Sequence, residues 1–112
     1  MSQITTHILD TTKGKPAAGV TIALLQHAGD NWHEIARGVT NDDGRIADLL
    51  PKKMRVELGV YKMKFFTKEY FAKDNTANFY PFVEIVFDVA TTEHYHVPLL
   101  LNPFGYATYR GS

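Results

Sequence analysis

The chain has 112 residues, of which 45% are hydrophobic. This is the usual size of one compact unit, so we expect a single domain over residues 1–112. Twelve basic residues balance twelve acidic ones without a block of like charge, which argues against a nucleic-acid surface or a polybasic membrane anchor.

The N-terminal residues run directly into patterned sequence, without a basic stretch followed by an apolar run. No run of about 18 apolar residues occurs anywhere. The sequence therefore predicts a cytoplasmic protein with no membrane partner. Cysteine is absent, so packing rather than disulfides must hold the fold together.

Short segments in which apolar and polar residues alternate, separated by Gly, Pro, Asn and Asp, predict half-buried antiparallel strands. In the first segment, residues 4–10, Ile4 and Ile8 share one face while Thr5 and His7 share the other. The first half of the chain therefore begins with a strand whose histidine points away from the core.

Two more strands are expected over residues 20–25 and 32–40, the second with Ile35 and Val39 facing the core. The sequence Asn-Asp-Asp-Gly at residues 41–44 then predicts a tight turn, because Asp and Gly tolerate the backbone conformation that a reversal requires. Arg45 emerges directly from this turn.

One helix of about two turns is expected over residues 68–75, capped by Thr67, with Tyr70 and Phe71 packing on a sheet edge. The remaining strands are expected over residues 46–50, 59–67, 83–89, 94–101 and 106–110. Seven or eight short strands with one small helix predict an all-β fold, a sandwich of two antiparallel sheets.

Three of the five histidines, His7, His94 and His96, lie inside predicted strands. Each alone is most simply interpreted as a surface residue. His94 and His96 are two residues apart, however, so on a strand they point to the same side at a spacing of about 7 Å. Paired imidazoles can bind a divalent metal, for which only His7 could be a third ligand, or one can act as a general base on water.

A general base on water works best beside a permanent cation that polarises the carbonyl under attack. Arg45 suits this task, because its planar guanidinium donates two parallel hydrogen bonds to a planar ligand. Taken alone, it is more simply interpreted as an exposed arginine after a hairpin. The C-terminal residues Tyr109, Arg110, Gly111 and Ser112 bring together an aromatic ring, a guanidinium and a hydroxyl, enough for a polar corner of a pocket; the alternative is a frayed strand end.

Several segments resemble the 5-hydroxyisourate hydrolases. They are TTHILD at residues 5–10, GKPAAGV at 14–20, TNDDGR at 40–45, EHYHVPLL at 93–100 and YRGS at 109–112. The last of these is similar to the tetrapeptide that distinguishes these hydrolases from transthyretin, the hormone carrier that shares their fold. The resemblance spans essentially the whole chain.

The resemblance implies a transthyretin-like sandwich of eight strands that assembles as a homotetramer, a dimer of dimers with active sites in the channel between dimers. It implies hydrolysis of 5-hydroxyisourate to 2-oxo-4-hydroxy-4-carboxy-5-ureidoimidazoline in urate breakdown, by water attack on a ring amide carbonyl. It implies neither a metal nor another cofactor.

By position, His7, Arg45 and His96 occupy the catalytic places of the resembled family. The resemblance implies that His94 and the segment from Tyr109 to Ser112 bind substrate. Ala107 stands where the family commonly has serine. Two alternatives stay open: a non-catalytic carrier of small ligands like transthyretin, which needs an apolar channel, and a metalloprotein that uses the three strand histidines.

Overall fold

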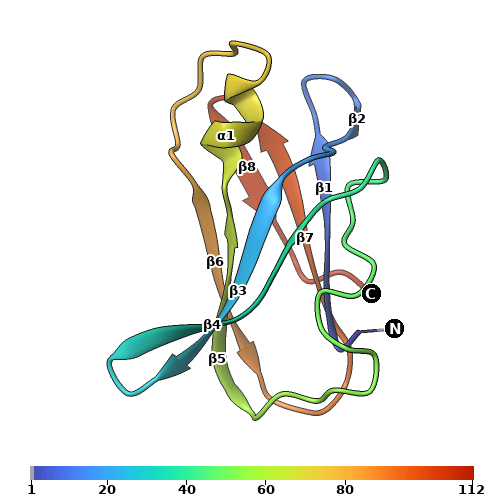
Figure 1. Cartoon of the computed structure of the whole chain (residues 1–112), viewed down its shortest axis with the longest axis vertical. Helices are drawn as coiled ribbons and strands as arrows, with labels where there is room; N and C mark the ends of the chain where they lie inside the picture. The colour runs from blue at the N-terminus through green and yellow to red at the C-terminus, as the bar shows by residue number, and fades with distance from the viewer. Residues whose placement is uncertain (1) are drawn as a thin grey trace.

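The computed structural model describes residues 2–112, which form eight strands and one short helix (Figure 1). In chain order the elements are β1 (Ile4–Asp10), β2 (Lys15–Pro16), β3 (Thr21–Ala28), β4 (Asn31–Val39), β5 (Gly59–Phe65), α1 (Thr67–Ala72), β6 (Val83–Val89), β7 (Tyr95–Asn102) and β8 (Gly105–Thr108). The strands form two four-stranded sheets, ordered β2-β1-β7-β8 and β4-β3-β5-β6. The predicted two-sheet sandwich with one helix is confirmed.

The pairing of β1 with β7 is parallel, whereas the other strand pairs among the described residues are antiparallel. The expectation of antiparallel sheets is therefore wrong at this one pair. Its register sets Thr5 opposite His96 and His7 opposite Pro98. Because partners in adjacent strands project to the same side of a sheet, this pair brings the two ends of the sequence onto one outer surface.

The core lies between the sheets and follows the predicted alternation. Ile4 and Ile8 of β1 are fully buried, as are Tyr61, Met63 and Phe65 of β5. The intervening β1 residues, including Thr5 and His7, are half-buried on the opposite face. The core thus fixes which face of β1 carries the polar side chains.

The prediction that Val39 faces the core is wrong, since Val39 is 57% exposed. Leu24 pairs with Ala36 and Leu25 with Glu34, so Ile35 is an extra residue on β4 and forms a bulge. This bulge changes the phase of the strand. Ile35 packs against the core, but the inner position further along β4 falls on Gly38 rather than on Val39.

The strand predicted over residues 46–50 is absent, and this segment forms turns and irregular structure. Leu49 and Leu50 are nevertheless buried and anchor the segment to the core. The apolar residues that suggested a strand therefore include two core anchors of an irregular segment.

The helix begins at Thr67 and ends at Ala72, three residues earlier than predicted. Its N-cap position is Phe66, without a side-chain cap, so the prediction that Thr67 caps it is wrong. Tyr70 and Phe71 are buried as expected. Within residues 2–112, no helix is long and apolar enough to cross a membrane.

Candidate active site

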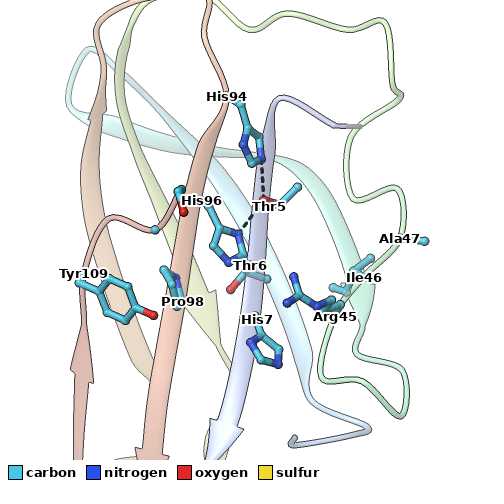
Figure 2. A pocket seen from close by; sticks show the side chains of 12 residues that line it. Thr5, Thr6, His7, Arg45, Ile46, Ala47, His94, His96, Pro98 and Tyr109 are labelled. Atoms are coloured by element: carbon cyan, nitrogen blue, oxygen red, sulfur yellow. Dashed lines mark hydrogen bonds between the residues drawn. The ribbon is translucent and has the colours of Figure 1, made fainter.

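A cavity of about 530 Å³ lies on the outer face of the β1–β7 pair (Figure 2). β1, the segment after the turn at residues 41–44, β7 and the C-terminal residues all contribute to its walls. The lining residues are Thr5, Thr6, His7, Arg45, Ile46, Ala47, His94, His96, Pro98, Tyr109, Gly111 and Ser112. The structure thus gathers His7, Arg45, His94 and His96, from three distant parts of the sequence, around one space.

Arg45 owes its place to the preceding turn. Gly44 has a φ of +72°, and a Cβ there would lie 2.5 Å from the carbonyl oxygen of Ile8, so only glycine allows this approach. The Ile8 amide donates to the Gly44 carbonyl at 3.0 Å. Asn41 Oδ1 accepts hydrogen bonds from the amides of Asp43, at 2.9 Å, and Arg45, at 3.2 Å. These bonds hold the turn against β1, next to His7.

His94 lies immediately before β7 and His96 within it. Their rings are stacked with centroids 6.2 Å apart and an interplanar angle of 25°. The Thr5 hydroxyl oxygen lies between them, 2.7 Å from His94 Nε2 and 2.8 Å from His96 Nδ1, as the dashed lines in Figure 2 show. The two imidazoles are therefore joined through one hydroxyl.

Gly111 fixes the other side of His96. Its amide donates to the His96 carbonyl at 2.9 Å, forming an isolated β-bridge beyond the end of β8. A Cβ at Gly111 would lie 2.5 Å from His96 Cδ2. The chain end thus packs against the imidazole edge itself, which explains why the predicted strand over residues 106–110 ends early, at Thr108.

The environment of His7 and His96 lowers the pKa of both imidazoles and so favours their neutral form. Burial lowers the pKa of His7 from its usual value, and the Arg45 cation lowers it further, against smaller raising effects of Asp43. Burial also lowers the pKa of His96, followed by repulsion from Arg45, His94 and His7. A neutral imidazole at neutral pH can accept a proton, as a general base must.

Arg110 is the one predicted site residue that does not line the cavity. Its guanidinium forms an ion pair with Glu93 at 2.6 Å and lies 4.3 Å from the centroid of the Tyr95 ring. It also donates to the His94 carbonyl at 3.2 Å. These contacts brace the segment that carries His94, and substrate binding by Arg110 stays a prediction.

The lining also includes residues that the sequence did not single out as functional, namely Thr5, Thr6, Ile46, Ala47 and Pro98. The alternation along β1 was the available signal for Thr5, since it shares a face with His7. Its position beside His96 depends on the register with β7, which no local pattern reveals.

The geometry does not support the hypothesis that His7, His94 and His96 bind a metal ion. Across residues 2–112, no group of three or more His, Cys, Asp or Glu side chains is arranged so as to hold a metal ion. His94 Nε2 and His96 Nδ1 are both directed at Thr5. What the arrangement offers chemically is a proton acceptor and a fixed cation facing the same water-accessible space.

The fold and this cavity together define a two-sheet β-sandwich protein with a histidine–arginine site on one sheet. The family model described as HIUase/Transthyretin family matches residues 4–111. The chain is 44% identical over 110 residues to the 5-hydroxyisourate hydrolase of Salmonella typhimurium, covering 97% of this chain and 80% of that protein.

Solved structures agree with this match. The 5-hydroxyisourate hydrolase of Klebsiella pneumoniae superposes with a TM-score of 0.86 at 36% identity, covering 99% of this chain and 100% of the other. Sea bream transthyretin in complex with thyroxine superposes with a TM-score of 0.90, also at 36% identity, covering 97% and 94%. The chain belongs to the HIUase/Transthyretin family.

Proposed function

We propose that this protein is a cyclic amide hydrolase that converts 5-hydroxyisourate to 2-oxo-4-hydroxy-4-carboxy-5-ureidoimidazoline in urate breakdown. The observation that carries the proposal is the meeting of the His7, His94 and His96 imidazoles with the Arg45 guanidinium in one cavity. The names of the hydrolase relatives support the same substrate. 5-Hydroxyisourate is planar and rich in hydrogen-bond acceptors, which suits a guanidinium clamp.

In the proposed mechanism, His7 and His96 hold a water molecule and remove its proton as its oxygen bonds to the ring carbonyl carbon. Arg45 holds the substrate and stabilises the oxyanion that forms on the carbonyl. Collapse of this intermediate breaks the carbon–nitrogen bond, and the leaving nitrogen takes up a proton. Tyr109, Gly111 and Ser112 line the same space and are proposed to contact the substrate.

The proposal includes assembly as a homotetramer, with the cavity opening into a channel between dimers. Tyr109, at the cavity, is 58% exposed in the single chain, so the wall it forms is open unless another subunit covers it. A cytoplasmic location remains a prediction, which fractionation of cells that express the protein would test.

The direct test is to mix the protein with freshly generated 5-hydroxyisourate and follow the ultraviolet absorbance. The wild type should accelerate its decay, whereas His96→Asn should reduce kcat by about 10²–10⁴-fold, the usual contribution of a general base. Arg45→Ala should also be strongly impaired. A folded, tetrameric His96→Asn variant with wild-type turnover would remove His96 from the mechanism.

A carrier function is the second candidate, because a transthyretin with bound thyroxine is a close structural match. A carrier requires an apolar channel, whereas this cavity is lined by three imidazoles and a guanidinium.

The metalloprotein alternative has its own test. Activity that survives exhaustive chelation would remove a metal from the mechanism.

A further inference from the structure

We infer that Thr5 and His94 are positioning residues that hold His96 in the tautomer with its proton on Nδ1 and its lone pair on Nε2. This inference rests on the proposed hydrolase function, which needs an imidazole able to accept a proton from water. It assigns the acceptor atom within the site and gives His94 a task that does not depend on touching the substrate.

The argument begins with the proton count of one hydroxyl. The Thr5 hydroxyl lies within hydrogen-bond distance of both His94 Nε2, at 2.7 Å, and His96 Nδ1, at 2.8 Å. A hydroxyl donates one hydrogen bond and accepts through its lone pairs. Because the two imidazoles are the only hydrogen-bond partners of the Thr5 hydroxyl among residues 2–112, one ring nitrogen accepts the Thr5 proton while the other donates to the Thr5 oxygen. This couples the tautomers of the two rings.

Two arrangements satisfy this rule when both rings are neutral. In one, Thr5 donates to His94 Nε2 and His96 Nδ1–H donates to Thr5, which leaves His96 Nε2 free to accept a proton. In the other, Thr5 donates to His96 Nδ1, so that His96 carries its proton on Nε2 and has no lone pair for the water. Only the first arrangement provides a base.

The surroundings of His96 favour the first arrangement. Arg45 and His7 lie on the side of His96 away from His94 (Figure 2), and the Arg45 cation disfavours positive charge on the His96 ring. A lone pair facing this cation is more stable than an N–H facing it.

The hydrogen bond to Thr5 disfavours the other orientation of His96, in which the ring is turned over. Gly111 is so close to Cδ2 that even a Cβ would lie 2.5 Å from that atom, and the Gly111 amide holds the His96 carbonyl at 2.9 Å. A turned ring would also replace Nδ1 by carbon opposite Thr5 and lose the 2.8 Å hydrogen bond. The contact with Gly111 thus restricts rotation of the ring, while the hydrogen bond to Thr5 selects its orientation.

The first experiment measures the tautomer directly. The wild type, Thr5→Val and Thr5→Ser are labelled with 15N-histidine, and the ring nitrogens are recorded by NMR at pH 7.5, with resonances assigned from single histidine variants. The wild type and Thr5→Ser should show His96 protonated on Nδ1. Thr5→Val, which keeps the shape and lacks the hydroxyl, should shift His96 toward the Nε2–H form.

The same variants are then assayed for hydrolysis. Thr5→Val should lower kcat roughly 10- to 100-fold, less than loss of the base itself, with little change in KM, and Thr5→Ser should restore it. His94→Leu removes one of the two ring nitrogens that can accept the Thr5 proton. Thr5 should then donate to His96 Nδ1, which enforces the inactive tautomer with the His96 proton on Nε2. Adding Thr5→Val to His94→Leu should therefore raise kcat above that of His94→Leu alone.

Purely structural roles predict the opposite, because two independent losses multiply. The inference is overturned if wild-type His96 carries its proton on Nε2, if Thr5→Val leaves the tautomer unchanged, or if the double variant is slower than either single one. The NMR measurement needs no substrate. A wild type that fails to hydrolyse 5-hydroxyisourate would therefore refute the proposed function while leaving the assigned tautomer to be decided by the spectra.

Discussion

Arg45 acts on His7 and His96 through space, before any substrate is bound. Its cation is the second-largest cause, after burial, of the lowered pKa of both His7 and His96. A lowered pKa keeps the imidazoles in their basic form at pH values below the usual 6.5. Activity should therefore persist below this pH and decline as pH falls through the lowered values.

Replacing Arg45 by alanine should raise both pKa values, so the acidic limb of the kcat/KM profile should move to higher pH. Arg45→Lys, which retains the charge, serves as the matched control and should shift the limb less. The measurement is kcat/KM against pH for the three proteins. Because the imidazoles form a coupled set, the apparent pKa belongs to the set. An unmoved limb in Arg45→Ala would show that this cation does not tune the base.

Residue identities revealed the reacting groups more readily than their supports. His7, Arg45 and His96 stand out because imidazole and guanidinium groups in or beside strands suggest proton transfer and anion binding. Thr5 does not stand out in the sequence, because threonine is common in strands. Its importance arises only from the register between β1 and β7. The contacts of Arg110 were hidden for the same reason, because its partners Glu93 and Tyr95 are close in space and 15 or more residues away in sequence.

The short helix α1 is tied to the end of β1 by one buried hydrogen bond. Tyr70 donates its hydroxyl to Asp10 Oδ2 at 2.7 Å. The other oxygen, Oδ1, accepts from the amides of Thr12 and Lys13 at 3.0 and 3.1 Å. Burial and this hydrogen bond raise the pKa of Tyr70 well above its usual value, so the hydroxyl remains a donor.

Tyr70→Phe should lower the free energy of unfolding by about 1–3 kcal/mol, because it leaves a carboxylate oxygen of the buried Asp10 without its donor. The measurement is urea denaturation at fixed protein concentration, since assembly would make stability depend on it. Tyr80→Phe removes a hydroxyl from a more exposed ring and should be nearly neutral. Equal stability of the two variants would contradict the anchoring role.

At the level of elements, alternation predicted every strand longer than two residues that pairs in the sandwich, because burial on one face imposes a period of two. It failed where tertiary contacts override local pattern. The bulge at Ile35 moved Val39 to the surface, the short strand β2 took the edge of β1, and the Phe66–Thr67 junction began the helix without a side-chain cap. The bulge and the edge strand depend on a partner strand, and the start of the helix depends on its tertiary surroundings, so local sequence reveals none of the three.

Two sheet edges meet on one side of the whole molecule. β6 and β8 are the terminal strands of their sheets, and Tyr80, just before β6, contacts the Tyr106 ring of β8 edge-to-face at 5.3 Å. Val86 on β6 is 58% exposed and Tyr106 is 42% exposed. Strand edges with exposed apolar side chains tend to pair with another chain, and identical edges can do so about a two-fold axis.

Val86→Lys should therefore disrupt the proposed assembly, because a lysine at this edge opposes pairing. Sedimentation velocity should show the wild type at about four times the 12.7 kDa chain mass and the variant at a smaller multiple. Leu58→Lys is the matched control: Leu58 is 61% exposed, lies before β5, and should leave the mass unchanged.

Hydrolysis, measured at the same concentrations, then tests whether the site depends on assembly. Val86 does not line the cavity, so any loss of activity in a folded Val86→Lys variant must come through the subunit contacts. If the active site lies in a channel between dimers, activity should fall in parallel with dissociation and return at high protein concentration. A dissociated variant with full activity would show instead that each chain closes its own site around His7, Arg45 and His96.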